Sequence, residues 1–281
     1  MTDMPKIIDS TAPIAAAIQL NSVADPDVNL AAAERLLRQA AAAGAALALL
    51  PENFAFMGAR ERDKLAFAEA DGQGPIQDFL AATAQELKLW IVAGTVPLTV
   101  PGDADKVYAA CLVYNAQGER AARYDKIHLF DVEVPGGERY RESATIARGA
   151  LEPVVVQTPI GKLGLSVCYD LRFPELYRAL AAQGAEVLCM PAAFTASTGQ
   201  AHWESLLRAR AIENQCFLIA AAQHGTHAGG RATHGHSLIL DPWGEVLAQQ
   251  AAGDGVVTAP LPPARLEQVR SSFPALTHRR M

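Results

Sequence analysis

The chain has 281 residues, of which 50% are hydrophobic, and its formal net charge at pH 7 is −6. This length and apolar content are enough for a substantial hydrophobic core in one large domain or two small ones. The acidic balance gives no electrostatic support for nucleic-acid binding, and the alanine-rich apolar runs are interrupted by glycine or charge, so we expect no membrane span.

The N-terminus and the cysteines indicate where the protein works. Residues 1–6 (MTDMPK) lack the basic and apolar regions of a signal peptide. The four cysteines are widely spaced and form no CxxC pair, which is typical of reduced thiols rather than of a disulfide framework. They are Cys111, Cys168, Cys189 and Cys216. We therefore expect a cytoplasmic protein, with Cys189 and Cys216 buried in strand-like apolar runs.

The first half of the chain alternates short apolar runs with helical segments. A helix is predicted over 27–43 because Asp25 and Pro26 stand at its start and Gly44 at its end. A turn signal at 116–118 separates two strand-like runs and favours a hairpin. In chain order the predicted elements are strand 14–20, helix 27–43, strand 46–50, helix 74–88, strand 89–93 and a hairpin of 108–115 with 119–124.

The second half continues in the same style. Its predicted elements are a strand ending at Cys168, helix 174–183, strand 186–190, helix 201–213, strand 216–222 and a hairpin of 236–240 with 245–248. Strands and helices in alternation, mixed with hairpins, predict an α/β protein whose sheets are covered by helices. Neither a linker nor a low-complexity block interrupts the chain, so residues 1–281 are expected to form a single domain.

The C-terminal segment 260–281 is punctuated by prolines and ends in His278, Arg279, Arg280 and Met281. We expect it to be a tail that packs across a surface, in particular a subunit interface. A frayed terminus is the alternative.

Cys168 lies where an apolar run gives way to a turn and then a helix, in the segment 161–175 (GKLGLSVCYDLRFPE). A strand would hold the thiol rigidly, and the turn could offer backbone N–H groups and a positive helix end to an anion. The alternative is that Cys168 is one more small buried residue, as most free cysteines are.

Three further ionisable residues stand out by position. Glu52 directly follows the predicted strand 46–50, where a carboxylate is costly unless it is paired or functional. Lys126 follows the second strand of the predicted hairpin, and Glu142 lies in a loop further on. Each also has an ordinary interpretation: Glu52 as a turn residue, Lys126 as a partner of Asp125 or Asp131, and Glu142 as a loop charge.

Three segments, 49–54 (LLPENF), 123–131 (RYDKIHLFD) and 164–175 (GLSVCYDLRFPE), resemble the signature segments of the nitrilase superfamily, also called carbon–nitrogen hydrolases. They occur in the family's order, and the resemblance runs from about Ile14 to Arg280. It implies a four-layer α-β-β-α sandwich, usually in a homodimer or larger homo-oligomer.

The resemblance also implies chemical roles. Glu52, Lys126 and Cys168 would form the family's Glu-Lys-Cys triad, with Glu142 as the second glutamate. Cys168 would add to an amide carbonyl while Glu52 takes its proton, and Lys126 with the backbone N–H of Tyr169 would hold the oxyanion. A thioester would follow and be hydrolysed by water. The reaction needs no metal and no organic cofactor.

Residues 194–214 and 220–246 resemble, within the superfamily, the branch of deaminated-glutathione amidases and ω-amidases. The first activity would release 2-oxoglutarate and cysteinylglycine, as metabolite repair; the second would convert 2-oxoglutaramate to 2-oxoglutarate and ammonia. Another small amide, a carbamoyl compound or a nitrile is a further alternative. A scaffold that kept only the fold is disfavoured, because a scaffold needs none of the three triad residues.

A 2-oxo carboxylate in the substrate calls for a fixed cation or backbone N–H groups in the pocket. Arg172 is the first candidate, although a salt bridge with Glu175 or Asp170 is the favoured alternative. Three residues expected in the loop after strand 186–190 are pocket candidates as well, with plain loop packing as their alternative. They are Phe194, Thr195 and Thr198.

Four histidines gather within thirteen residues, at His224, His227, His234 and His236. Imidazole is a common zinc ligand, but the segment is rich in glycine and brings no acidic or cysteine ligand. We therefore predict a mobile loop over the pocket rather than a metal site.

Overall fold

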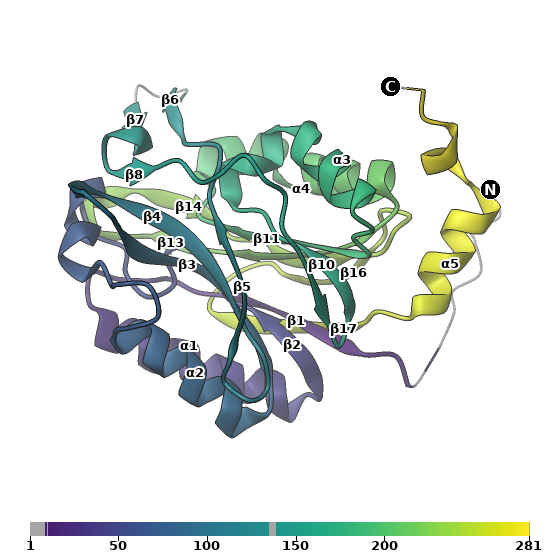
Figure 1. Cartoon of the computed structure of the whole chain (residues 1–281), viewed down its shortest axis with the longest axis horizontal. Coiled ribbons are helices and arrows are strands. Elements are labelled where there is room, and N and C mark those ends of the chain that lie inside the picture. Colours follow the sequence, from purple (N-terminus) through teal and green to yellow (C-terminus); the bar gives the residue numbers. More distant parts are fainter. Residues whose placement is uncertain (1–8, 10, 135–138, 281) are drawn as a thin grey trace.

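Two β-sheets stacked face to face form the centre of the protein in the computed structural model, which describes residues 9, 11–134 and 139–280 (Figure 1). The expectation for residues 1–6 lies outside this range, as does Met281 of the predicted tail. The first sheet has seven strands, in the order β17-β1-β2-β3-β4-β5 with β8 paired to β4. They are β1 (Ile14–Gln19), β2 (Ala45–Leu49), β3 (Trp90–Val100), β4 (Asp103–Tyr114), β5 (Arg120–Asp125), β8 (Ile146–Ala147) and β17 (Gly255–Pro260).

The second sheet has six strands in the order β16-β15-β12-β11-β10-β9. They are β9 (Val155–Thr158), β10 (Gly161–Gly164), β11 (Val187–Ala192), β12 (Phe217–Ala222), β15 (Ser237–Leu240) and β16 (Val246–Gln250). Two small hairpins pair β6 (Asp131–Glu133) with β7 (Arg139–Arg141), and β13 (His224–Thr226) with β14 (Ala232–His234).

Helices cover the outer face of each sheet (Figure 1). The first sheet carries α1 (Pro26–Ala42) and α2 (Pro75–Leu87), and the second carries α3 (Pro174–Ala182) and α4 (Ala196–Asn214). Short 3₁₀ segments complete the chain: η1 (Glu61–Phe67), η2 (Glu142–Ala144), η3 (Cys168–Arg172), η4 (Ala228–Gly230) and η5 (Ala275–His278). The layers follow the order α-β-β-α, so the predicted sandwich is confirmed.

The strand β2 illustrates why the central strands are apolar throughout. Leu47 and Leu49 belong to the core between the two sheets, whereas Ala48 and Leu50 belong to the core beneath α1 and α2. Successive side chains of a strand point to opposite faces, and here both faces are covered. A continuous apolar run is therefore required, rather than an alternation with polar residues.

The predicted helix 27–43 corresponds to α1, whose start is fixed by local chemistry. The carboxylate of Asp25 accepts the backbone N–H of Asp27 at 3.0 Å, and Pro26 occupies the first turn. A side-chain acceptor at this position satisfies a donor that the helix leaves open, and proline suits the first turn because it has no N–H to lose.

Four predicted boundaries were wrong. β4 begins at Asp103 instead of 108. β3 continues to Val100 instead of ending at 93, because it forms a long antiparallel pair with β4. The strand predicted to reach Cys168 ends at Gly164, and Cys168 opens η3. The helix predicted over 201–213 begins at Ala196, so Thr198 lies in its first turn rather than in a loop.

The C-terminal segment forms α5 (Pro263–Ser272), which packs on its own subunit. Leu266 and Val269 are buried, and the buried Arg265 donates to the carboxylate of Asp241 at 2.9 Å. A frayed terminus is therefore wrong for 263–272. In the part of the chain that the structure describes, no helix is long and apolar enough to cross a membrane.

Candidate active site

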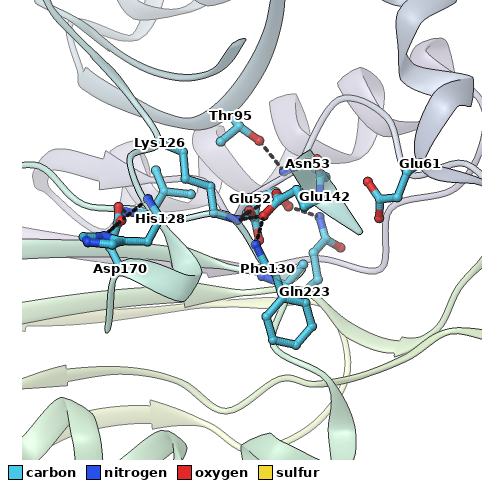
Figure 2. Close-up of polar contacts among 12 residues, drawn as sticks. Glu52, Asn53, Glu61, Thr95, Lys126, His128, Phe130, Glu142, Asp170 and Gln223 are labelled. Atoms are coloured by element: carbon cyan, nitrogen blue, oxygen red, sulfur yellow. Dashed lines mark hydrogen bonds and ion pairs between the residues drawn. The ribbon is translucent and has the colours of Figure 1, made fainter. Parts of the chain in front are cut away.

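Lys126 lies between two carboxylates at one end of the stacked sheets. Its Nζ atom is 2.9 Å from Oε1 of Glu52, and 2.8 and 2.9 Å from the two carboxylate oxygens of Glu142. Figure 2 shows the lysine side chain reaching between the two glutamates. All three side chains are buried, so two carboxylates share one ammonium where solvent screens the charges little.

Glu52 is held at the carboxyl end of β2 by contacts along its whole length. Its Oε2 atom accepts the backbone N–H of Ala193 at 2.9 Å, and its backbone carbonyl accepts the side-chain amide of Gln223 at 3.0 Å. A Cβ atom on Gly94 would lie 2.1 Å from the carbonyl oxygen of Pro51. Only glycine therefore permits β3 to approach the Pro51–Glu52 segment this closely.

Glu142 follows β7 at the start of η2 and is fixed from the other side of the lysine. Its Oε2 atom accepts the backbone N–H of Phe130 at 2.6 Å, in addition to the ammonium of Lys126. Lys126 and Phe130, four residues apart in the segment after β5, are thus both hydrogen-bonded to Glu142.

Cys168 has a left-handed backbone conformation, with φ of 47°. Such a conformation is unusual for a residue with a side chain and is frequent at functional sites. Asp170 stabilises this turn because its carboxylate accepts the backbone N–H of Val167 at 2.8 Å. The same carboxylate accepts the hydroxyl of Tyr124 at 2.7 Å and lies 2.7 Å from Nδ1 of His128.

The electrostatics of the site favour a carboxylate beside a neutral thiol. Burial acts to raise the pKa of Glu52, but the ammonium of Lys126 outweighs it and leaves that pKa below its usual value. Burial raises the pKa of Cys168 well above the usual value, and the negative charge of Glu52 raises it further. Burial also opposes the charge on Lys126, yet Glu142 and Glu52 hold the pKa of its ammonium above the ordinary range. The arrangement therefore provides a base, a thiol and a fixed cation together.

The thiol and its neighbours line a cavity. Its walls include all four predicted catalytic residues and four of the predicted substrate-binding residues. These are Glu52, Lys126, Glu142, Cys168, Tyr169, Phe194, Thr195 and Thr198. The hydroxyls of Thr195 and Thr198 are 2.6 Å apart, so α4 presents a polar edge to the cavity with its first turn.

Residues 14–271 match the family model described as carbon–nitrogen hydrolase. The chain belongs to the carbon–nitrogen hydrolase family. This hydrolase is 49% identical over 267 residues to the deaminated glutathione amidase of Synechocystis, an alignment that covers 95% of this chain and 97% of the relative.

Solved structures similar to this chain also include amidases and members of the nitrilase superfamily. The hydrolase is similar to Nit3 of Saccharomyces cerevisiae, a member of branch 10 of the nitrilase superfamily, with a TM-score of 0.84, 29% identity and coverage of 96% of this chain and 97% of that one. It is also similar to a glutamate-to-glutamine variant of the amidase from Nesterenkonia in which acrylamide has added to the active-site cysteine. For that structure the TM-score is 0.77, the identity 28% and the coverage 93% and 98%. The predicted superfamily is confirmed.

Arg172 does not join the predicted pocket residues. Arg172 is not among the described residues that line the cavity of this hydrolase. Its guanidinium lies 5.2 Å from the ring centre of Phe194 and 5.9 Å from that of Tyr169, and 3.4 Å from His202. Arg172 thus contacts two residues that line the cavity, Phe194 and Tyr169.

Sequence reasoning missed three charged residues of the cavity. Glu61 and Lys64 come from η1, in a stretch for which no element was predicted, and Arg231 comes from the histidine-rich segment. The only available signal for Arg231 was an isolated cation among glycines. Nothing in the local pattern relates it to Cys168, because the two meet only through the folded second sheet.

The histidine-rich segment of this hydrolase forms the hairpin β13–β14 beside the cavity. His227 is buried between the carbonyl of Ser22, at 2.9 Å, and the hydroxyl of Thr233, at 2.7 Å. His234 and His236 stack on each other, with ring centres 4.5 Å apart. Within the described ranges, no group of three or more histidine, cysteine or acidic side chains is arranged to hold a metal ion.

Proposed function

We propose that this carbon–nitrogen hydrolase cleaves deaminated glutathione to 2-oxoglutarate and cysteinylglycine, as a metabolite-repair amidase. The observation that carries the proposal is the 49% identity, over 95% of the chain, to a relative named deaminated glutathione amidase. The cavity agrees with such a substrate, because it combines a thiol, a base and several cations with aromatic walls.

In the proposed reaction, the Cys168 sulfur attacks the carbonyl carbon of the amide, and Glu52 takes the thiol proton. The carbonyl oxygen becomes an alkoxide, which the Lys126 ammonium and the backbone N–H of Tyr169 stabilise. The raised pKa of Cys168 beside an ionised Glu52 supports this order, since the thiol then needs a base at the moment of attack.

The tetrahedral intermediate collapses when its C–N bond breaks and Glu52 returns the proton to the leaving nitrogen. Cysteinylglycine departs, and the acyl group stays on Cys168 as a thioester. Water, deprotonated by Glu52, then attacks the thioester carbonyl. The C–S bond breaks, 2-oxoglutarate leaves, and Glu52 returns the proton to the sulfur of Cys168. Glu142 keeps the Lys126 ammonium in place through both steps, which the two contacts of 2.8 and 2.9 Å support.

The assay is release of 2-oxoglutarate from deaminated glutathione and from 2-oxoglutaramate, by wild-type enzyme and by Cys168→Ala. We expect a strong preference for deaminated glutathione, abolished in the variant. A preference for 2-oxoglutaramate would make the protein an ω-amidase with the same mechanism. No release from either would reject the 2-oxo acid substrates and direct the search to other small amides, carbamoyl compounds and nitriles.

Labelling with iodoacetamide or acrylamide tests the nucleophile separately. Cys168 lines the cavity, whereas Cys111, Cys189 and Cys216 are completely buried in the core. The glutamate-to-glutamine variant of the Nesterenkonia amidase, in which acrylamide has added to the active-site cysteine, supports the same role for Cys168. We expect Cys168 to be modified first. Equal or absent modification of all four thiols would contradict its role and favour a scaffold.

We further propose that the enzyme works as a homodimer or larger homo-oligomer in the cytoplasm. Three exposed large apolar side chains support an interface. Ile212 near the end of α4, Trp243 in the turn between β15 and β16, and Phe273 directly after α5 are 50%, 41% and 58% exposed. Four unpaired cysteines support a reducing compartment. Light scattering of the wild type and of Trp243→Glu tests the assembly; a monomeric wild type would reject it.

A further inference from the structure

Arg231 is the residue that most needs an explanation beyond the proposed chemistry. It lies between η4 and β14 and lines the cavity of Cys168. Its Nη2 atom donates to the backbone carbonyl of Ala193 at 3.0 Å, and its Nη1 atom lies 3.3 Å from Oε1 of Glu61. The guanidinium also sits 5.1 Å from the ring centre of Tyr140. The hydrolytic steps leave this cation without a role.

The position of Arg231 relative to the thiol follows from one shared neighbour, Ala193. The backbone N–H of Ala193 donates to the Glu52 carboxylate at 2.9 Å and also interacts with the thiol of Cys168. The carbonyl of the same residue accepts from Arg231. The guanidinium and the reacting thiol therefore lie on two sides of a single residue, which is a separation that one small acyl chain can span.

The guanidinium of Arg231 has more N–H donors than its contacts with Ala193 and Glu61 use. A guanidinium carries five N–H donors in a planar fork, of which Ala193 and Glu61 take two. Its Nε atom is buried and has no hydrogen-bond partner within the described part of the chain. A buried donor without a partner is costly, and a planar pair of donors matches a carboxylate in bidentate fashion.

The charges around Glu61 also favour an additional anion. Glu61 pairs with Lys64 at 3.0 Å as well as with Arg231, so two cations share one carboxylate. Lys64 is the main reason that the pKa of Glu61 is lowered to about 2, and Glu61 is therefore ionised at neutral pH. Lys126, by contrast, is shared by two carboxylates, Glu52 and Glu142. The three cations and three carboxylates of the cavity therefore balance overall, but they are unevenly placed, with two cations to one carboxylate at the Arg231 end.

We propose that Arg231 is a specificity-determining residue that binds the 2-oxo carboxylate at the acyl end of the substrate, with Glu61 and Ala193 holding the guanidinium in position. This inference rests on the proposed function for the identity of the acyl group. Lys64 is the natural comparison, because it carries the same charge, lines the same cavity and pairs with the same glutamate, but extends to a neighbouring cavity beside Phe56 and Tyr108.

The test compares Arg231→Gln, Arg231→Lys and Lys64→Gln on 2-oxoglutaramate, deaminated glutathione and the neutral amide butanamide. Hydrogen bonds to charged groups contribute about 1.5–3 kcal/mol. We therefore expect Arg231→Gln to lower the ratio of kcat/KM for 2-oxoglutaramate over kcat/KM for butanamide by roughly 10- to 150-fold. Arg231→Lys should lower that ratio less, because it keeps the charge but not the fork, and Lys64→Gln least.

Three outcomes would overturn the inference. An unchanged ratio would make Arg231 structural. A loss confined to deaminated glutathione would place Arg231 at the glycine carboxylate of the leaving group. A larger selective loss in Lys64→Gln would assign the acyl carboxylate to Lys64.

Titration calorimetry of 2-oxoglutarate separates this inference from the proposed function, because it needs no turnover. The proteins are Cys168→Ala and the double variant Cys168→Ala/Arg231→Gln. If the wild type hydrolyses neither 2-oxo acid amide, the proposed function fails, but 2-oxoglutarate binding that weakens at least tenfold in the double variant still supports the carboxylate site. Equal binding by the two proteins, or no binding to Cys168→Ala, overturns it.

Discussion

The carboxylate of Asp170 lies 2.7 Å from Nδ1 of His128. Each of these residues stands two positions after a candidate catalytic residue, His128 after Lys126 and Asp170 after Cys168. Their contact therefore joins the segment that carries the ammonium, from the first sheet, to the segment that carries the thiol, from the second. Asp170 is completely buried, so this link is screened little by solvent.

Replacing Asp170 by Asn should lower both activity and stability. The carboxylate accepts from the backbone N–H groups of Val167 and His128 and from the Tyr124 hydroxyl, and an amide cannot accept on both sides. Leaving a buried donor unsatisfied costs about 1–3 kcal/mol, and a misplaced thiol can lower kcat about 100-fold. Chemical denaturation and steady-state kinetics measure the two effects.

Tyr124→Phe is the matched control, because it removes one hydrogen bond to the same carboxylate and leaves the other contacts of Asp170 intact. We expect about 1 kcal/mol of destabilisation and a much smaller loss of kcat. Asp170→Asn with wild-type kcat would show that the link does not position the site.

The pH dependence of kcat/KM should follow Glu52 and Cys168. Protonation of Glu52 at low pH removes the base, and its pKa lies below the usual 4.5. Ionisation of Cys168 at high pH places a second negative charge beside Glu52, and the thiol pKa lies above the usual 9.0. We therefore expect a flat profile through neutrality, with its acid limb below the range of an ordinary glutamate and its alkaline limb above that of an ordinary cysteine.

A profile measured with a neutral amide avoids titration of the substrate. The control is Glu52→Gln, in which the acid limb should disappear together with about 100- to 10,000-fold of the rate. An acid limb between pH 6 and 7 in the wild type would point to a histidine instead and contradict the assignment of Glu52.

Gly94→Ala should reduce kcat by moving Glu52. The new methyl group would lie 2.1 Å from the carbonyl oxygen of Pro51, a backbone atom that cannot rotate away. A shift of about 1 Å in a catalytic group can cost roughly 100-fold in rate. The matched control is Gly164→Ala on β10, where the nearest atoms belong to the side chain of Leu180 at 3.2 Å, which can adjust. Equal activity of the two variants would show that the approach of β3 does not fix Glu52.

Arg265→Leu should destabilise the fold strongly without changing the chemistry. Arg265 and Asp241 form a buried ion pair, and Asp241 also accepts the backbone N–H groups of Trp243 and Glu245. Removing one partner of a buried pair costs about 3–5 kcal/mol, because the other charge stays buried. Thermal and urea unfolding measure the change.

Arg38→Leu is the control for loss of an arginine from a helix, since the exposed Arg38 of α1 pairs with Glu34 of the same helix and with Glu86 of α2. Its unfolding midpoint should stay close to that of the wild type. If both variants unfold alike, the attachment of α5 to the β15–β16 hairpin contributes little.

Local chemistry made much of the fold predictable. The helix predicted over 174–183 is observed over Pro174–Ala182, with a proline at its start, and both hairpins predicted from turn residues are present. The strand predicted over 89–93 was too short, because β3 continues through Pro97, which pairs with Ala109 inside the ladder. The first turn of α4, ASTGQ, has weak helix formers, and its packing against β14 at Gly199 and His234 was not visible in the sequence.

The candidate site was also only partly predictable from the sequence. Glu52, Lys126 and Cys168 were predicted from motifs that lie next to strands, and Glu142 was predicted as the family's second glutamate. Arg172 was selected because it is close to Cys168 in the sequence, and Arg231 was overlooked because it is far from Cys168 in the sequence. Tertiary packing decides which residues of η3 line the cavity, and it also brings the β13–β14 hairpin with Arg231 to the cavity. Local sequence patterns do not encode this packing.

The division of the site between two sheets has a consequence for the chain during synthesis. Glu52 and Lys126 leave the ribosome before Cys168, and Ala193, which contacts both Glu52 and Cys168, follows later still. Until the second sheet has docked on the first, the thiol has no adjacent base and is an ordinary cysteine. Under the proposed mechanism, a nascent or half-folded molecule therefore does not hydrolyse cellular amides, and hydrolysis begins only when folding is complete.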